Sequence, residues 1–477
     1  MKSTEVKSVF ISGKFNVIHS GHIRLFMYAK TLGENLVVAL DSEGLDAAEI
    51  AWRIEFLRNQ EFVDSVVVFE GDISGEILKL KPDIVLKGSE FEGQFNAEAS
   101  LVATYGGQLI FSSGSTYFSE TDLLNRKEGN LEIWKPALPE EFLKRNKIER
   151  SELQHQLEGF NNLRVCVIGD LIVDEYINCH PLGMSREEPT VVVTPIDSMK
   201  FLGGAGIVAA HAVGLGANTT LITILGNDDV ATWSQNKARE YGVAVLPVID
   251  KNRPTTLKQR YRSGNHTLLK VSHLSQEEVN QETKAQIEKN FENIAANIDV
   301  LILSDFSYGT FSDSSAEKLI EIAKKNGIFV SADSQTSSQV GNLAQFIGAD
   351  LVTPTEVEAR AELKDNSSGL AVIVEKLRNR LKAKYVLLKL GSDGVLIHGI
   401  DQSGSLKPTD ALPSLNSNPL DTSGAGDSML AAASMALRVN ADLPRAALLG
   451  SASAAIQISR TGNIPISQGN LQKILSP

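Results

Sequence analysis

Cysteine is almost absent from this chain of 477 residues, since Cys166 and Cys179 are its only two. Two thiols cannot build a disulfide framework or a four-thiolate metal site, so both of these classes of protein are excluded. An uninterrupted apolar run of membrane-spanning length is also lacking, and the N-terminus has no apolar signal core. We therefore expect a cytoplasmic protein with no membrane partner.

An excess of positive charge is missing as well. The chain carries 46 Lys and Arg against 58 Asp and Glu, for a net charge of −12. Nucleic-acid-binding domains usually present a basic patch, so no nucleic-acid partner is expected. Nucleotides stay possible as ligands, because they need only a local cluster of donors.

Two parts of the chain alternate apolar, strand-like segments with helical stretches, which predicts parallel α/β sheets. In the first part the expected strands are residues 8–12, 36–40, 65–69, 84–86 and 108–111. In the second part they include residues 163–170, 220–224, 300–303, 328–332, 351–352 and 385–389. A charged stretch without proline, Glu140 to Glu158, lies between the two parts. The pattern predicts an α/β protein with domains at 1–126 and 161–477, joined by linker helices over 127–160.

A β-rich region interrupts the second part. Residues 190–194, 256–262 and 267–271 resemble antiparallel ribbons, and residues 263–266 suit a hairpin turn. Such a small β-flap would cover a substrate or pair with a second subunit. Its partly apolar strand edges favour a homodimer, because unpaired edges tend to find a partner.

The N-terminal motif is G-K-F-N-V-I-H-S-G-H, over Gly13 to His22, after an apolar run at residues 9–11. A loop that leads from a strand into a helix presents backbone N–H groups to an anion. His19 and His22 flank the Ser20-Gly21 step, so both imidazoles can face that anion. Two such donors would neutralise charge during attack on the α-phosphate of a nucleoside triphosphate. A metal pair or two solvated surface histidines are the alternative interpretations.

The C-terminal motif is Gly424-Ala425-Gly426-Asp427, which opens into a stretch of small residues. Its glycines let backbone amides approach an anion closely, and the following helix adds its positive end. Asp427 is placed to accept the proton of a sugar hydroxyl, as a general base in phosphoryl transfer. A glycine-rich turn with an N-capping Asp is the alternative interpretation.

Residues 8–126 resemble the cytidylyltransferase-like nucleotidyltransferases, whose pattern is G-x-F-D-x-x-H-x-G-H. The likeness extends to the segments 81–91 and 118–124, although Asn16 replaces the usual Asp and Glu120 lies inside an S-T-T element. The resemblance implies a Rossmann-like domain with a parallel sheet that binds ATP or CTP, and it makes His19 and His22 catalytic. It implies nucleotide contacts from Gly13, Phe15, Asn16, Lys87, Ser119 and Thr121.

Residues 162–477 resemble the ribokinase-like sugar kinases in four elements: Gly169-Asp170 with Asp174, 203–205, 389–394 and 421–427. The resemblance implies an α/β sandwich that uses Mg²⁺ and ATP, with Asp427 as base and Gly424, Ala425 and Gly426 as an anion hole. It implies sugar contacts from Asp170, Asp174, Gly203 and Gly204, nucleotide contacts from Lys389 and Gly391, and Glu358 as the residue that organises Mg²⁺.

Within that family, residues 169–176, 185–189 and 303–309 are most similar to the heptose-phosphate kinase module of bacterial lipopolysaccharide precursor synthesis. The bifunctional heptose-7-phosphate kinase/heptose-1-phosphate adenylyltransferases also carry a nucleotidyltransferase, usually after the kinase, so the order here is reversed. Several positions depart from that pattern, namely Ile207, Tyr308, Gln335 and Thr355. Lys258, Arg260 and Lys270 on the flap are candidate ligands for a substrate phosphate.

The expected function is a bifunctional enzyme with small-molecule substrates. One domain would phosphorylate a sugar or sugar phosphate with ATP. The other would join a sugar 1-phosphate to a nucleoside monophosphate unit and release pyrophosphate, giving an ADP-heptose-like product. A partly degenerate protein, which binds nucleotide or sugar with one or neither activity, is the alternative.

Overall fold

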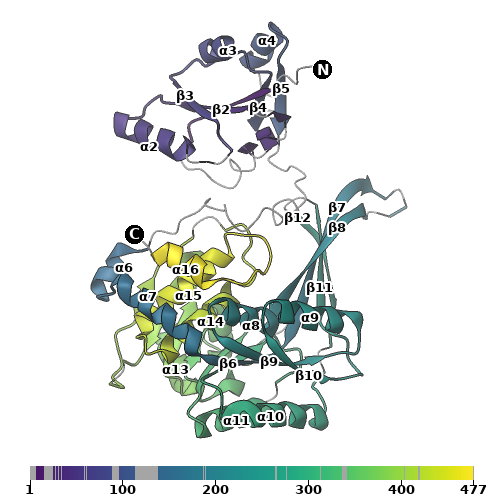
Figure 1. Cartoon of the computed structure of the whole chain (residues 1–477), viewed down its shortest axis with the longest axis vertical. Coiled ribbons are helices and arrows are strands. Elements are labelled where there is room, and N and C mark those ends of the chain that lie inside the picture. The colour runs from purple at the N-terminus through teal and green to yellow at the C-terminus, as the bar shows by residue number, and fades with distance from the viewer. Residues whose placement is uncertain are drawn as a thin grey trace. The chain divides into compact units, whose positions relative to one another are not determined.

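The computed structural model divides the chain into two compact units, one within residues 1–133 and one over Trp134–Ser263 and Thr267–Pro477. Figure 1 gives their secondary structure. The residues that the structure describes are 7–15, 25–26, 28–30, 32–33, 35–58, 60, 62–88, 96–112, 138–185, 187–188, 190–263, 266–275, 277–311, 313–335, 341–401, 403–416 and 419–475.

The first unit contains a parallel five-stranded sheet in the order β3-β2-β1-β4-β5. Its strands are β1 Ser8–Gly13, β2 Asn35–Asp41, β3 Ser65–Phe69, β4 Ile84–Gly88 and β5 Gln108–Ser112. Its described helices include α2 Ala47–Arg58, α3 Ser74–Leu80 and α4 Ala97–Ala103. Val9 and Ile11 belong to one apolar cluster and Phe10 to another, so both faces of the sheet are covered, as in other parallel sheets.

The second unit is built on a nine-stranded sheet in the order β10-β9-β6-β13-β14-β15-β16-β17-β18, which is parallel as far as β16. The strands are β6 Arg164–Gly169, β9 Asn218–Leu225, β10 Ala244–Ile249, β13 Val300–Asp305, β14 Phe329–Ser334, β15 Leu351–Val352, β16 Tyr385–Lys389, β17 Val395–Gly399 and β18 Asp410–Leu412. All eleven strands predicted for the two parallel sheets are confirmed, and their ends differ from the prediction by at most two residues.

Helices cover both faces of this sheet, which makes the predicted α/β sandwich. One apolar cluster contains residues of α8 Ala205–Gly214, α9 Asp229–Glu240, α14 Ala425–Arg438, α15 Leu443–Gln457 and α16 Gln468–Leu475. The other contains residues of α10 Gln281–Ala295, α11 Asp313–Lys325, α12 Glu356–Leu363 and α13 Leu370–Leu381. No helix among the described residues is both long and apolar enough to cross a bilayer.

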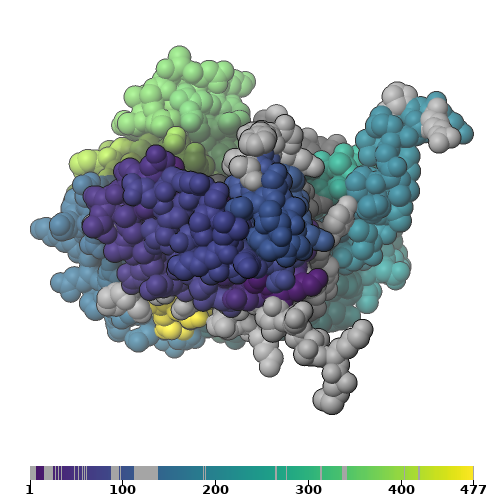
Figure 2. Space-filling view, turned by 90° about the horizontal axis from the view of Figure 1, so that it is seen from above, coloured from purple at the N-terminus to yellow at the C-terminus, as the bar shows by residue number. Residues whose placement is uncertain are grey.

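The β-flap is a separate sheet in the order β12-β11-β7-β8, formed by β7 Leu171–Met184, β8 Val191–Gly204, β11 Leu257–Ser263 and β12 His266–His273. The long β7–β8 hairpin projects from its unit (Figures 1 and 2). β8 contains the predicted residues 191–194 and pairs antiparallel with β7, a strand that was not predicted from the sequence. β11 pairs with β7 in parallel, which corrects the expectation of antiparallel ribbons there. β7 and β11 start at the same edge of the main sheet, where the backbone N–H of Val173 donates a hydrogen bond to the backbone oxygen of Thr256 at 2.9 Å.

The predicted linker helices belong to the second unit. They are α6 Glu140–Arg145 and α7 Arg150–Gly159, and their apolar side chains Phe142, Leu153 and Leu157 lie in the same core as α15. Arg145 also pairs with Asp410 at 2.8 Å. The two helices therefore extend the second unit ahead of the predicted domain start at residue 161, because an amphipathic helix with an apolar stripe packs on a core instead of spanning solvent.

Candidate functional site

The candidate site lies at the carboxyl edge of the main sheet. β6 has β9 on one side and β13 on the other, so the strand order reverses beside it, and ligands of open α/β sheets bind at such points. Asp170 follows β6, Asp305 ends β13 and Asp333 is the last residue but one of β14. The sequence therefore brings several acidic side chains to one edge.

Asp427 is buried in the first turn of α14, with 5% of its surface exposed. Gln335 Nε2 donates a hydrogen bond to its Oδ1 at 2.9 Å. Burial, followed by the charges of Asp333 and Asp174, raises the pKa of Asp427 to about 7, although Lys389 and Gln335 oppose the shift. A carboxyl group that exchanges its proton near neutrality suits a general base.

Lys389 ends β16, and its Nζ lies 2.8 and 3.1 Å from the two carboxylate oxygens of Asp333. A Cβ placed on Gly426 would be 3.1 Å from that Nζ. The structure thus brings together the predicted Lys389, Gly426 and Asp427. It adds Asp333, which the sequence did not single out because its role depends on a lysine 56 residues away.

The other residues of the predicted anion hole surround the start of α14. Gly424 has φ 75° and caps the helix, and Ala425 is its first residue. A Cβ on Gly424 would lie 2.5 Å from Asn463 Oδ1, so a larger residue would clash there. The first N–H groups of a helix lack partners within it, which favours an anion at this place. Gly391 lies at the exposed start of a short 3-10 helix, Gly391–Asp393, with φ 62°.

Asp174 and Arg260, both on the flap, belong to a hydrogen-bond network that connects the flap to the loop before α14. Arg260 Nη2 lies 3.4 Å from Asp174 Oδ1, and Arg260 Nη1 donates to Tyr176 Oη at 3.2 Å and to Ser423 Oγ at 3.1 Å. Tyr176 Oη in turn donates to Asp421 at 3.0 Å. Burial raises the pKa of Asp174, although Arg260 and Lys258 partly offset this. Sequence reasoning selected Asp174 and Arg260 but missed Tyr176 and Asp421, whose pairing spans 245 positions.

The two glycines at the end of β8 allow close packing against these aspartates. A Cβ on Gly203 would lie 2.6 Å from Asp174 Oδ2, and one on Gly204 would lie 2.2 Å from Asp170 O. Gly204 also has φ 55°, which disfavours any other residue. Gly203 and Gly204 therefore pack closely against Asp174 and Asp170, and their contact with a sugar stays a prediction.

Asp170 is bonded to the loop that follows β13. Its carboxylate accepts hydrogen bonds from the backbone N–H groups of Phe306, Tyr308 and Thr310 at 2.8, 3.2 and 3.3 Å, and from Thr310 Oγ1 at 2.5 Å. With both oxygens engaged, Asp170 holds the 306–310 loop at the end of β13. Whether Asp170 also contacts a sugar stays a prediction.

The two lysines predicted on the flap, Lys258 and Lys270, lie at different distances from the site. Lys258 Nζ lies 5.1 Å from the centre of the Tyr308 ring and 5.7 Å from that of Phe306, next to the site. Lys270 is exposed on β12, and β11 separates that strand from β7. Lys270 therefore does not join the group around Asp174, and its role as a substrate ligand stays a prediction.

Glu358 is 7% exposed in α12, where its carboxylate accepts a hydrogen bond from Thr355 N at 2.7 Å in a capping box. Among the described residues no group of three or more His, Cys, Asp and Glu could hold a metal ion. Mg²⁺ is compatible with this, since it often takes one or two carboxylates together with substrate phosphates and water. Glu358 stays the predicted residue for it.

In the first unit, Gly13 ends β1 and Lys87 lies near the end of β4, and these neighbouring strands border the crevice where the strand order reverses. Lys87 Nζ pairs with Glu98 Oε1 at 2.6 Å. Phe15 is buried against Phe26, with φ 43° at its backbone. The other predicted residues of this domain, Asn16, His19, His22, Ser119 and Thr121, lie outside the described residues.

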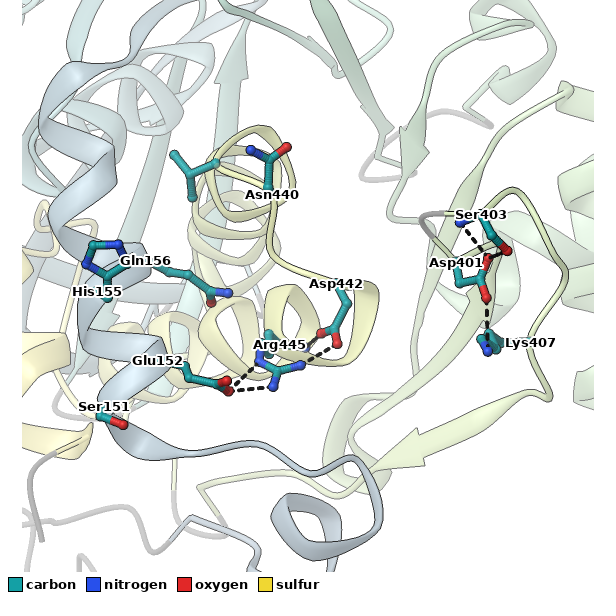
Figure 3. A pocket seen from close by; sticks show the side chains of 11 residues that line it. Ser151, Glu152, His155, Gln156, Asp401, Ser403, Lys407, Asn440, Asp442 and Arg445 are labelled. Carbon is teal, nitrogen blue, oxygen red and sulfur yellow. Dashed lines mark hydrogen bonds and ion pairs between the residues drawn. The ribbon is translucent and has the colours of Figure 1, made fainter.

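A hollow of about 810 Å³ on the second unit lies apart from these motif residues, between α7, the start of α15 and the 401–407 turn (Figure 3). Arg445 is bonded there to Glu152 and Asp442, and Lys407 pairs with Asp401 at 2.9 Å. These charged side chains neutralise one another, so the hollow presents no concentrated charge to a ligand.

Comparison with known structures shows the class of fold. Phosphofructokinase-2 from Escherichia coli, in complex with potassium, gives a TM-score of 0.53 at 21% identity and covers 66% of this chain and 98% of its own. Ribokinase of Arabidopsis thaliana, complexed with ribose and ATP, gives 0.53 at 19% identity and covers 66% and 99%. The second unit has a ribokinase-like fold.

The family follows from the sequence comparisons. The model of the pfkB family carbohydrate kinases matches residues 162–468, and the chain belongs to this family. The bifunctional protein HldE of Campylobacter fetus subsp. fetus is 27% identical over 318 residues, and that of Desulfatibacillum aliphaticivorans is 28% identical over 318 residues. These matches cover 66% of this chain and 67% and 63% of the two relatives.

We predict that Asp170→Asn lowers the free energy of unfolding of the second unit by about 2–3 kcal/mol, because charged acceptors of several hydrogen bonds are lost. Urea denaturation in the absence of any ligand measures this. Asp393→Asn, at an exposed position, is the matched control and should leave the midpoint unchanged. If Asp170→Asn leaves the midpoint unchanged but abolishes turnover, Asp170 acts in substrate binding and not in stabilising the fold.

Proposed function

We propose that the chain is a bifunctional enzyme that makes a nucleotide-activated sugar: an ATP-dependent sugar kinase with a sugar-1-phosphate nucleotidyltransferase before it. The observation that carries the kinase part is the buried Asp427 at the start of α14, beside the glycine loop and Lys389. The relatives' name, bifunctional protein HldE, supports the pairing of two activities. The resemblance of residues 169–176, 185–189 and 303–309 to the heptose-phosphate kinase module supports a heptose phosphate as the sugar.

In the kinase reaction, Asp427 accepts the proton of the sugar hydroxyl as its oxygen attacks the γ-phosphorus of ATP. The bond from that phosphorus to the β–γ bridging oxygen breaks, and ADP leaves. The amides at the start of α14 hold the transferred group. Mg²⁺, organised by Glu358, neutralises phosphate charge when bound. Asp174 and Arg260 orient the sugar, and Arg260 or Lys258 holds its phosphate.

For the transferase, the support is the strand order β3-β2-β1-β4-β5, with Gly13 and Lys87 beside the point of reversal. His19 and His22 follow Gly13 in the sequence and are proposed to neutralise charge at the attacked phosphate. The nucleotide is ATP or CTP, and a product of the ADP-heptose type would form from ATP. The protein would act in the cytoplasm, where nucleoside triphosphates are plentiful.

We predict that two variants separate the activities. Asp427→Asn should abolish ADP release from ATP and a heptose phosphate, since the base is lost, but leave pyrophosphate release from ATP and a separately supplied sugar 1-phosphate intact. His19→Ala should do the reverse. Both products are measured in parallel across heptose, hexose and pentose substrates with ATP and CTP. A folded wild-type protein that binds ATP but forms neither product would support the partly degenerate binding protein instead.

The kinase should lose activity as the pH falls through about 7, the raised pKa of Asp427, because a protonated carboxyl cannot accept the proton. Below that pH, kcat/KM should fall about tenfold for each pH unit. The profile from about pH 5.5 to about pH 9 measures this, with saturating coupling enzymes at each pH. A profile that is flat through this range would exclude Asp427 as the base.

We also propose a homodimer formed through the flap. Large apolar side chains are exposed on the β7–β8 hairpin: Leu182, Met184, Val191 and Ile196 are 50–62% exposed. A second copy of the hairpin would cover them. Sedimentation velocity should give twice the mass of 51.6 kDa, and Leu182→Glu with Ile196→Glu should give the monomer. A monomeric wild-type protein would contradict the proposal.

A further inference from the structure

Four polar side chains meet beside the first turn of α14: Asp333, Gln335, Lys389 and Asp427. From the point where a Cβ of Gly426 would lie, Lys389 Nζ is 3.1 Å away, and Asp333 Oδ2 and Gln335 Nε2 are each 3.8 Å away. The lysine ammonium is thus beside the backbone of the glycine loop. That backbone is the place where an anion would be held.

The short strand β15 allows the lysine to reach this place. β15 contains only Leu351 and Val352 and lies between β14 and β16. Lys389 N donates to Pro354 O at 2.8 Å, two residues beyond the end of β15. The side chain that leaves the end of β16 therefore extends past β15 to Asp333 on β14.

The charges around Lys389 are unbalanced. Asp333, Glu358 and Asp427 are all buried, and the charges of all three raise the pKa of Lys389. Burial lowers that pKa, but the carboxylates outweigh burial, so the amine carries a proton. An ATP triphosphate would bring further negative charge to this place, and such an arrangement needs a cation in direct contact.

Lys389 is also the accessible member of its ion pair. Its side chain is 14% exposed, whereas that of Asp333 is 1% exposed. Lys389 is therefore the member of the pair that a ligand at the glycine loop can contact more readily, because its Nζ is also the nearer group to the Gly426 Cβ position, at 3.1 Å against 3.8 Å for Asp333 Oδ2. Gln335, which replaces a lysine of the sugar-kinase pattern, contributes only a neutral amide to Asp427.

We propose that Lys389 is a catalytic residue whose ammonium binds the γ-phosphate of ATP at the Gly424–Gly426 loop, and that Asp333 is the positioning residue that holds it there. The inference rests on the proposed kinase function. During transfer the ammonium keeps its proton, while the proton of the sugar hydroxyl goes to Asp427 and ADP takes the bridging oxygen. Lys389 stabilises the charge on the oxygens of the transferred group.

The test compares Lys389→Met with Lys389→Met/Asp333→Asn in the full chain. The single variant should lose about 100- to 1,000-fold in kcat, the loss typical for one donor to a developing charge. Its affinity for Mg²⁺-ATP should fall by about tenfold or more, and its affinity for Mg²⁺-ADP should not change, because ADP lacks the γ-phosphate. Titration calorimetry measures both affinities.

The double variant removes the carboxylate charge that the single variant leaves buried and unpaired. It should fold as well as the wild type and still lack turnover and the preference for ATP over ADP. Restored kcat and ATP affinity would overturn the proposal, since Lys389 would then serve only to neutralise Asp333. An equal loss of ATP and ADP affinity in the single variant would overturn it too.

Lys384→Met is the matched control, because Lys384 lies just before the same strand and pairs with Asp350 at 2.9 Å away from the loop. It should retain kcat and both affinities. If the wild-type protein forms no ADP with any sugar, the proposed kinase function fails. The comparison of ATP with ADP binding still decides the role of Lys389 in that case.

Discussion

The burial of acidic side chains at the start of α14 is the constraint on which the second unit depends. Asp427, Asp333 and Glu358 are each less than a tenth exposed, and a buried carboxylate is costly unless opposite charge or donors surround it. The positive end of α14, the ammonium of Lys389 and the amide of Gln335 supply that environment. Strands β14 and β16 must end at the same edge for these groups to meet.

A second network, made of hydrogen bonds, connects the flap to the loop that precedes α14. Arg260 on β11 contacts Asp174 and Tyr176 on β7 and Ser423 before α14, while Tyr176 donates to Asp421. A movement of the flap would therefore change the surroundings of the loop that leads to the anion hole. This gives a physical link between closure over a sugar and the arrangement of the groups proposed to transfer the phosphoryl group.

The two units use one physical rule in different ways. In both, parallel strands end at a common edge, and the order of strands reverses beside the first of them, β1 or β6. In the first unit Gly13 and Lys87 border that point. In the second unit, Asp170 lies at that point, and its carboxylate is bonded to the 306–310 loop. The residues proposed for the chemistry lie at the start of helix α14 instead.

The sequence by itself determined all strands of the first sheet and six of the nine of the second, the α/β class and the residues of the glycine loop, because these follow from local alternation and short motifs. It did not determine the parallel pairing of β11 with β7, the packing of α6 and α7 on the kinase core, or the hydrogen bonds of Asp170 to the 306–310 loop. Those depend on which segments meet in space. The pair of Lys389 with Asp333 and that of Tyr176 with Asp421 join residues 56 and 245 positions apart, and only the tertiary structure places their charges and donors within hydrogen-bonding distance.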